Sequence, residues 1–161
     1  MEKISVGNPV PDLEVRATDD QKFMLSDLRG KNVVLYFYPK DNTPGCTTEG
    51  QDFRDQYEEF RKLNTDIFGI SRDSLKSHDG FKNKECLPFD LISDDDEQLC
   101  KLFDVIKEKT LYGKKYLGID RSTFILDPEG IVRKEFRSVK VDGHVSAVLA
   151  EIQKLAKENK D

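Results

Sequence analysis

The chain has 161 residues, and its 26 basic and 31 acidic side chains give a formal net charge of −5. This length can bury an ordinary core without disulfides, so a single domain spanning residues 1–161 is expected. The charges are mixed along the sequence without a basic patch, which argues against a nucleic-acid partner. No apolar run reaches the roughly 18 residues of a membrane span, and the first residues lack a signal-peptide core. A cytoplasmic protein without a membrane partner is expected.

The three cysteines, Cys46, Cys86 and Cys100, are an odd and widely spaced set. Such a set fits neither the disulfide framework of a small secreted protein nor a zinc-binding pattern. Neither His78 nor His144 has a second histidine at ligand spacing, so the sequence predicts no metal site. Free thiols in a reducing compartment are the expected state.

The first part of the chain predicts a hairpin followed by a buried strand. Residues 1–12 are rich in glycine and proline and are expected to form an irregular lead-in. Residues 13–17 and 22–25 are predicted strands joined by a turn. One helical turn is expected at 26–30, and residues 33–38 are apolar at every position. A continuous apolar run of this kind is typical of a central strand that is covered on both faces.

Downstream of Cys46, the spacing of apolar residues predicts an alternation of helices and strands. In chain order we expect a helix to about residue 63, a buried strand at 66–71, a polar helix at 74–87, a short strand at 91–92, a helix at 94–103, a loop at 104–120, strands at 122–126 and 131–136, and a helix from about residue 142. This order predicts the α/β class and a thioredoxin-like fold. Its central mixed sheet would be flanked by helices and extended by the N-terminal β-hairpin.

Residues 36–51, YFYPKDNTPGCTTEGQ, place Cys46 between the end of the central strand and the start of a helix. Ligands of open α/β sheets bind at such junctions, and a helix N-terminus stabilises an anion such as a thiolate. Thr43 can offer its hydroxyl to the sulfur or to a substrate oxygen. Arg121 is the expected cation, because it precedes a strand that would lie beside residues 33–38. The pattern predicts a reactive cysteine.

Each of these residues taken alone has an ordinary structural explanation. A cysteine at a helix start is more often structural than catalytic, and an arginine before a strand is usually solvated. The combination is more informative, because Pro39, Thr43 and Cys46 form a P-x-x-x-T-x-x-C pattern directly after a buried strand.

The stretch PKDNTPGCTTE, the lead-in GNPVPDLEV and the late stretch GIDRSTFILDPEG resemble the Q-type peroxiredoxins, the bacterioferritin comigratory protein subgroup. The resemblance covers nearly the whole chain. It implies a thiol peroxidase that reduces hydrogen peroxide and organic hydroperoxides and needs no cofactor. By match to the motif, Cys46 would be the peroxidatic nucleophile, Thr43 would orient the peroxide and Pro39 would shield the sulfur. Arg121 would stabilise the thiolate, and Glu49 would orient Arg121.

The peroxidatic reaction leaves a sulfenic acid, which a second thiol must trap before it is over-oxidised. Many Q-type relatives carry that resolving cysteine five residues after the first, but this chain has Gln51 there. A second subset carries it on the following helix, at a position that aligns near Lys82, one turn before Cys86. Since a disulfide needs Cα atoms within about 7 Å, bridging Cys46 to Cys86 would require local unwinding.

Three alternatives for Cys86 therefore stay open: a resolving thiol, a structural thiol, and an enzyme that uses Cys46 alone with an external thiol. The resemblance implies thioredoxin or another small thiol donor as the reductant, and a monomer or weak homodimer. Cys100, which lies among apolar residues, is predicted to be a core residue.

Three other functions fit the sequence less well than a peroxidase does. A thioredoxin-fold thiol–disulfide oxidoreductase needs a C-x-x-C motif, and here the first position is Thr43. A Cys–His hydrolase would need a histidine to activate Cys46, and only the distant His144 could serve. The alternative from another class is a non-enzymatic, chaperone-like module with an inert Cys46.

Overall fold

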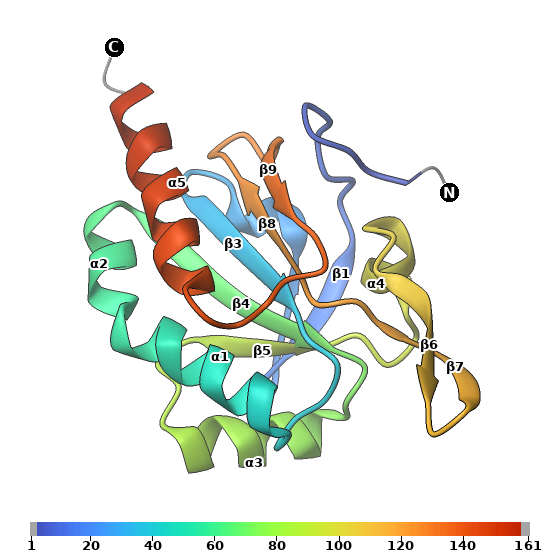
Figure 1. Ribbon diagram of the computed structural model, residues 1–161. Helices are drawn as coiled ribbons and strands as arrows, with labels where there is room; N and C mark the ends of the chain where they lie inside the picture. The colour runs from blue at the N-terminus through green and yellow to red at the C-terminus, as the bar shows by residue number, and fades with distance from the viewer. Residues whose placement is uncertain (1–2, 159–161) are drawn as a thin grey trace.

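The computed structural model describes residues 3–158, and Figure 1 shows the path of the chain. The first two residues of the predicted lead-in and the last three of the predicted domain lie outside the described residues. The strands are β1 (Glu14–Ala17), β2 (Gln21–Met24), β3 (Asn32–Phe37), β4 (Thr65–Ser71), β5 (Asp90–Ser93), β6 (Ile106–Leu111), β7 (Lys114–Ile119), β8 (Ser122–Leu126) and β9 (Val132–Phe136). The helices are the 3₁₀ helix η1 (Leu25–Leu28) and the α-helices α1 (Pro44–Asp55), α2 (Tyr57–Lys62), α3 (Leu75–Glu85), α4 (Gln98–Leu102) and α5 (His144–Glu158).

Seven strands form one mixed sheet in the order β2-β1-β5-β4-β3-β8-β9. The pairs β3–β4 and β4–β5 are parallel, and the remaining pairs are antiparallel. The β1–β2 hairpin forms one edge of the sheet, and helices lie against both sheet faces (Figure 1). The predicted thioredoxin-like α/β fold with its N-terminal hairpin is confirmed.

Strand β3 is buried at every position because both of its faces are covered. Val33, Leu35 and Phe37 belong to the core that also includes residues of η1 and α4. Val34 and Tyr36 point to the other face and pack with residues of α1, α2, α3 and α5. Alternate residues of a strand face opposite sides, so a central strand with two covered faces must be apolar throughout.

The register of β3 determines what lies beside its carboxyl end. Phe37, the last residue of β3, pairs with Ile70 of β4 and with Ser122 of β8. Because β8 runs antiparallel to β3, its first residue lies where β3 ends. Arg121, which precedes Ser122, is therefore brought next to the loop that leads to Cys46.

Several predicted boundaries were wrong. The helix expected up to about residue 63 is two helices, because the backbone at Gln56 (φ −103°, ψ 4°) interrupts it. The helix expected at 94–103 is only α4, because Asp94 stays outside it and accepts hydrogen bonds from the amides of Leu99 and Cys100, at 2.9 and 2.7 Å. An acidic side chain that caps a helix start gives the same sequence signal as one inside its first turn.

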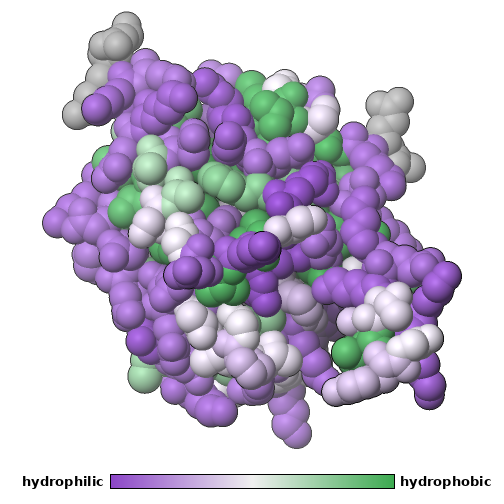
Figure 2. Space-filling model, in the orientation of Figure 1, coloured by the Kyte–Doolittle hydropathy of each residue, from purple (hydrophilic) through white to green (hydrophobic). Residues whose placement is uncertain are grey.

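The expected loop at 104–120 was also wrong, because it is the β6–β7 hairpin. Its two-residue turn consists of Tyr112 and Gly113, both with positive φ (52° and 76°), as the tight turns of hairpins require. The hairpin carries most of the large apolar side chains that are exposed among the described residues, and pale and green surface lies over it at the lower right of Figure 2. These side chains are Leu111, Tyr112, Tyr116 and Leu117.

Within residues 3–158, no helix is both long enough and apolar enough to cross a membrane.

Candidate active site

The loop after β3 delivers Cys46 to the first turn of α1. Thr43 is the N-cap residue, with an extended backbone (φ −91°, ψ 153°), and Pro44 occupies the first helical position. The Thr47 amide donates to the Thr43 carbonyl at 2.9 Å, which closes the first turn. Pro44 has no N–H, so the amides of Gly45 and Cys46 are the free donors at this helix start. The predicted placement of Cys46 at a helix N-terminus is confirmed.

Arg121 links Cys46 to Glu49. Its Nη2 donates to Cys46 Sγ at 3.4 Å, and its Nη1 donates to Glu49 Oε1 at 2.5 Å. Cys46 is almost fully buried, and the Arg121 side chain is only 15% exposed. A hydrogen bond from a guanidinium favours the charged form of its acceptor. The structure therefore brings together three of the predicted site residues.

Glycine is needed at position 45 so that the Arg121 guanidinium can approach the Cys46 sulfur. A Cβ placed there would lie 3.1 Å from Arg121 Nη2, closer than ordinary van der Waals contact. Gly45 thus leaves room for the guanidinium to reach Cys46.

The carboxyl group of Glu49 is fully buried. Burial raises the pKa of Glu49 from its ordinary value of 4.5 to about 7, although Arg121 acts in the opposite direction. Its second oxygen, Oε2, has no hydrogen-bond partner among residues 3–158 and lies 4.0 Å from His144 Nε2. The charge of the Glu49–Arg121 pair therefore changes near neutral pH.

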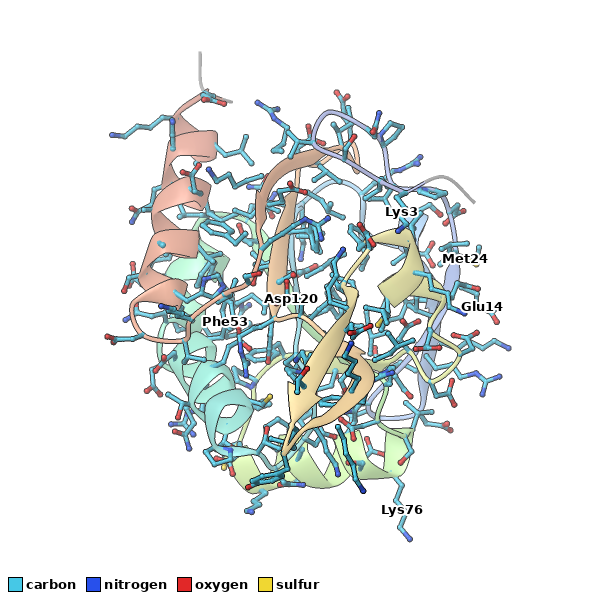
Figure 3. All side chains as sticks on the ribbon, turned by 45° about the vertical axis from the view of Figure 1, so that its right-hand side comes forward. Lys3, Glu14, Met24, Phe53, Lys76 and Asp120 are labelled. Atoms are coloured by element: carbon cyan, nitrogen blue, oxygen red, sulfur yellow. The ribbon has the colours of Figure 1, made fainter. Side chains whose placement is uncertain are left out.

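His144 lies at the start of α5 and is also buried. Its Nε2 forms a hydrogen bond of 2.8 Å with Thr123 Oγ1 on β8. Burial and, after it, the positive charge of Arg121 lower the pKa of His144 from 6.5 to about 4. His144 is therefore uncharged at neutral pH. Figure 3 shows the region around it, with Phe53, whose ring packs edge-on against His144, where α1 meets α5.

The β6–β7 hairpin brings a second cation toward the site. Burial lowers the pKa of Lys109 on β6, Asp120 opposes this effect, and Arg121 adds to it. Sequence reasoning missed Lys109, because its segment was expected to be a loop without a defined position.

Pro39 and Thr43 lie in the same loop, as predicted. Pro39 is half-buried at the end of β3, and Thr43 is also half-buried. The Thr43 hydroxyl donates to the Lys40 carbonyl at 2.7 Å. This bond uses the hydroxyl proton and leaves oxygen lone pairs that can accept a hydrogen bond.

Cys86 lies outside helix α3 instead of inside it. The predicted helix 74–87 ends at Glu85, and Cys86 is its exposed C-cap residue with left-handed backbone angles (φ 54°, ψ 45°). The Leu87 amide donates to the Lys82 carbonyl at 3.0 Å, a bond typical of a helix that ends in this way. The Cys86 amide still donates to the Lys82 carbonyl, so Cys86 lies one turn beyond Lys82 as expected, but at the end of the helix and not inside it.

The end of α3 packs against the middle of α1. Gln51 Nε2 and Arg54 Nη1 donate to the side chain and the carbonyl of Glu85, each at 2.8 Å. Gln51 follows Cys46 by five residues, which is ~7.5 Å along a helix axis at ~1.5 Å per residue. Cys86 is thus anchored beside a later part of α1 than the part that carries Cys46.

Cys100 and Lys82, the other two positions considered from the sequence, have structural roles in the fold. Cys100 is fully buried in α4, and burial together with Asp94 raises the pKa of its thiol, so it stays protonated. The predicted core position of Cys100 is confirmed. Lys82 Nζ lies 2.8 Å from Asp19 Oδ2 and 2.7 Å from Asp90 Oδ1, so this position holds an ion pair between α3 and the sheet edge. All three cysteines are free in the structure.

One buried group near the site was not found from the sequence. His78 was expected on a polar helix, yet it is fully buried beneath the loop at Asp41, whose carboxylate lies 2.8 Å from its Nδ1. The two residues are 37 positions apart, so no local pattern reports the contact.

The sequence of this chain is similar to those of known peroxiredoxins. The model of the AhpC/TSA family matches residues 6–135. Peroxiredoxin Bcp of Xanthomonas campestris pv. campestris is 58% identical over 129 residues, 80% of this chain and 81% of that protein. Peroxiredoxin Bcp of Bacillus subtilis is 49% identical over 153 residues, 95% of this chain and 98% of that protein.

A solved structure of the Xanthomonas campestris bacterioferritin comigratory protein also matches. It has a TM-score of 0.86 and 52% identity, and the match covers 89% of this chain and 92% of that one. The structure is a trapped intermediate and ligand complex that concerns the alkyl peroxide reduction activity of that protein.

Fold and site define a thioredoxin-like protein whose buried thiol is held by an arginine–glutamate pair. The chain belongs to the AhpC/TSA family. Within it, the chain is a Q-type peroxiredoxin, a thiol-dependent peroxidase, as the resemblance implied. The chain is therefore neither a thiol–disulfide oxidoreductase nor a non-enzymatic module, two of the alternatives to a peroxidase.

Proposed function

We propose that Cys46 is the thiol that reduces the peroxide, and that Arg121 is the group that stabilises the reaction. The hydrogen bond of 3.4 Å between Arg121 Nη2 and Cys46 Sγ is the observation that carries this proposal. Arg121 reaches the sulfur while it also binds Glu49, so the guanidinium is held in one orientation. Cys100, by contrast, is a fully buried thiol whose pKa is raised by burial and by Asp94, although Arg72 acts in the opposite direction.

The reaction is an attack of the Cys46 thiolate on the terminal oxygen of a hydroperoxide. A sulfur–oxygen bond forms as the O–O bond breaks, and the leaving alkoxide or hydroxide takes a proton from solvent. The products are a sulfenic acid on Cys46 and an alcohol or water. Negative charge moves from sulfur to the leaving oxygen, so the guanidinium and the free amides of the α1 start stabilise the transition state.

The other residues of the loop would orient the peroxide. The Thr43 hydroxyl donates to the Lys40 carbonyl, so its oxygen is free to accept a hydrogen bond from the O–H of the hydroperoxide. Pro39, half-buried at the end of β3, would keep water from the sulfur. Glu49 would fix the direction of the Arg121 guanidinium by its hydrogen bond to Nη1.

The substrates would be hydrogen peroxide and organic hydroperoxides. One feature of the β6–β7 hairpin supports organic substrates: large apolar side chains are exposed on it. The hairpin would therefore offer an apolar surface to the organic part of a hydroperoxide.

Cys86 would regenerate Cys46, with a thioredoxin-type protein as the final reductant. Cys86 is exposed and lies at a helix end, so it can move without loss of core packing. Its neighbour Glu85 is bonded to Gln51 and Arg54, so Cys46 can approach Cys86 only if the first turns of α1 unwind. The sulfenic acid on Cys46 and the thiol of Cys86 would then condense to a disulfide and release water.

Rapid mixing of the reduced protein with hydrogen peroxide tests this function. Wild-type protein and the variants Cys86→Ser and Cys100→Ser should each consume peroxide in a fast first turnover, whereas Cys46→Ser should not. Fast consumption by Cys46→Ser, or none by the wild-type protein, would overturn the proposal.

A further inference from the structure

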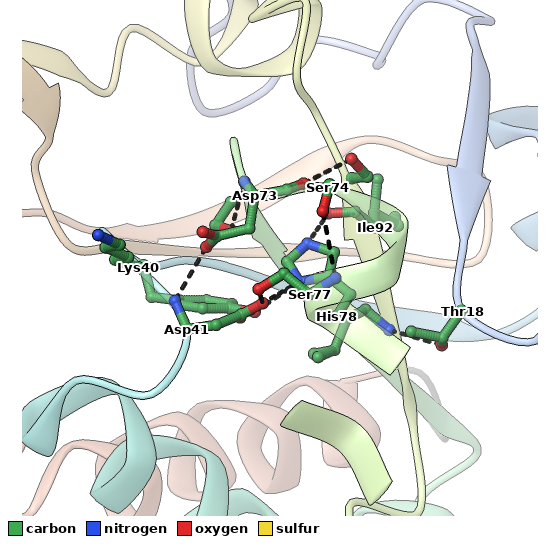
Figure 4. Close-up of polar contacts among 12 residues, drawn as sticks. Thr18, Lys40, Asp41, Asp73, Ser74, Ser77, His78 and Ile92 are labelled. Atoms are coloured by element: carbon green, nitrogen blue, oxygen red, sulfur yellow. Dashed lines mark hydrogen bonds and ion pairs between the residues drawn. The ribbon is translucent and has the colours of Figure 1, made fainter. Parts of the chain in front are cut away.

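A buried hydrogen-bond network lies beneath the loop that precedes α1 (Figure 4). Asp41 is at its centre and is only 4% exposed. Its Oδ1 accepts from the Tyr38 hydroxyl at 2.6 Å, and its Oδ2 accepts from Ser77 Oγ at 2.8 Å. His78 Nδ1 lies 2.8 Å from the same Oδ2. The carboxylate therefore ties the end of β3 to helix α3.

His78 is held from both sides of its ring. Its Nε2 lies 3.0 Å from the carbonyl oxygen of Ile92 on β5, and a carbonyl can only accept, so Nε2 carries a proton. The distance between Asp41 Oδ2 and Nδ1 is that of a hydrogen bond, so a proton lies between these two atoms. Without that proton, two lone pairs would face each other at 2.8 Å. His78 thus connects β5 to the loop by two directional bonds.

The same network reaches the Thr43 hydroxyl through one peptide group. The amide of Asp41 donates to Asp73 Oδ2 at 2.9 Å, and Asp73 Oδ2 also accepts from Ser71 Oγ at 2.6 Å. The carbonyl group of the same peptide belongs to Lys40, and it accepts a hydrogen bond of 2.7 Å from the Thr43 hydroxyl. A rotation of the Lys40–Asp41 peptide would therefore turn Thr43 away from its present direction.

We propose that His78 and Asp41 are positioning residues of the peroxidase site, which fix the Lys40–Asp41 peptide and so aim the Thr43 hydroxyl at the peroxide. The inference rests on the proposed function, because it needs Cys46 as nucleophile and Thr43 as acceptor. Neither His78 nor Asp41 touches the reacting atoms.

Stability alone gives a poor reason for this network. Buried hydrogen-bonded polar groups are often no more stabilising than apolar residues of the same volume, because burial removes their hydration. Ligand atoms of Asp41, Asp73 and His78 lie within 4.8 Å of one another, but both carboxylates already accept hydrogen bonds from Tyr38, Ser71 and Ser77. The arrangement is best explained by the direction that it imposes on the loop.

Two substitutions of His78 separate positioning from simple packing. The amide nitrogen of asparagine is as many bonds from Cα as Nδ1, and that of glutamine as many as Nε2. His78→Asn therefore keeps a donor toward Asp41, while His78→Gln keeps only the donor toward Ile92. Both variants are polar and similar in size, so both disturb the core in a similar way.

The readout is the rate constant of Cys46 oxidation by hydrogen peroxide, measured in single turnovers on folded protein. We expect His78→Gln to lower it by about 10- to 100-fold, the range for a misplaced orienting group, and His78→Asn to stay within about threefold of wild type. Alkylation of Cys46 by iodoacetamide, which needs no peroxide orientation, should be unchanged in both. Equal losses in both variants, or no loss in His78→Gln, would overturn the proposal.

A double-mutant cycle tests the connection to Thr43. Thr43→Val should slow oxidation, and adding His78→Gln to it should change the rate by less than about twofold, because both act on the same hydroxyl. If the double variant is slowed by the product of the two separate factors, the proposal is contradicted. Val15→Ala, a cavity in the core on the opposite face of the sheet, should lower stability but not this rate. If Cys46→Ser still consumes peroxide at the wild-type rate, the proposed function itself fails, and this outcome is distinct from a failure of the His78 inference.

Discussion

Arg121 Nη2 lies 3.4 Å from the sulfur of Cys46, although the two residues are 75 positions apart in the chain. The contact exists because β8 runs antiparallel to β3, so that the residue before β8 meets the loop after β3. The other guanidinium nitrogen binds Glu49 on the same helix as Cys46. One planar group thus joins the sulfur to a buried carboxyl.

Arg121→Lys should slow the oxidation of Cys46 although it keeps the positive charge. An ammonium group cannot bind Cys46 and Glu49 in the fixed directions of a guanidinium fork. We expect a loss of about 100-fold in the single-turnover rate with hydrogen peroxide, the size typical for one lost donor to a developing negative charge. Arg133→Lys on β9 is the matched control and should react at the wild-type rate. A rate within twofold of wild type for Arg121→Lys would contradict the role of the fork.

Gly45→Ala should impair the same step by displacing Arg121. The added Cβ would lie 3.1 Å from Nη2, so the guanidinium has to move away from Cys46. We expect about a 10-fold slower oxidation, because small misplacements of catalytic groups are costly. Gly80→Ala on α3 is the control, since its Cβ would meet no atom within 4 Å. That variant should react normally and gain about 0.5–1 kcal/mol of stability, as alanine is the better helix former. An equal rate in both variants would show that the space at Gly45 is not needed.

The buried Glu49 and His144 should have opposite effects on the pH dependence of stability. The pKa of Glu49 is raised to about 7, so this residue lowers the free energy of unfolding as pH rises from 4.5 to 7. The pKa of His144 is lowered to about 4, so that residue lowers the same free energy as pH falls from 6.5 to 4. Between pH 4.5 and 6.5 the two contributions oppose each other in the wild-type protein.

Single substitutions should reveal each contribution. Relative to wild type, Glu49→Gln should gain stability with rising pH, and His144→Gln should gain it with falling pH, by up to about 1.4 kcal/mol per pH unit in this window. Urea unfolding at several pH values measures these differences. Parallel curves for the wild-type protein and both variants would contradict the burial-driven pKa directions.

Cys86→Ser should separate the first step of the cycle from its completion. The variant should oxidise Cys46 at the wild-type rate, because the hydrogen bond of the Cys86 thiol goes to the Asn83 carbonyl, while Arg121 binds Cys46 and Glu49. Turnover with a thioredoxin system should be lost, since the sulfenic acid has no internal partner. Cys100→Ser is the control for removal of a thiol. Unchanged turnover in Cys86→Ser would make this a one-cysteine enzyme that is reduced directly by an outside thiol.

The sequence predicted the fold best where buried residues leave a periodic or continuous pattern of apolar side chains. The apolar run at 33–38 predicted a central strand, and the strand after Arg121 predicted its neighbour, so the meeting of Arg121 with Cys46 was foreseeable. The β6–β7 hairpin was not foreseeable in the same way. Most of its positions are exposed on both faces, which removes the alternation of polar and apolar residues, and its Tyr112–Gly113 turn lacks the usual asparagine or aspartate.

Long-range polar contacts were beyond sequence reasoning. His144 approaches Glu49 from α5, and His78 approaches Asp41 from α3, and neither contact has a fixed spacing in the chain. The end of α3 was predicted two residues too late for another reason, since Cys86 takes a left-handed backbone conformation that the sequence pattern does not reveal. The chemistry of the site could be predicted, while the groups that support it needed the fold.

The most direct test of Cys46 as the peroxide-reducing thiol is peptide mapping after hydrogen peroxide in the presence of dimedone, which traps sulfenic acids. In the Cys86→Ser background, one equivalent of peroxide should give a dimedone adduct on the peptide that contains Cys46, with Cys100 unmodified. An adduct on Cys100, or an unmodified Cys46 after the peroxide has been consumed, would contradict the account.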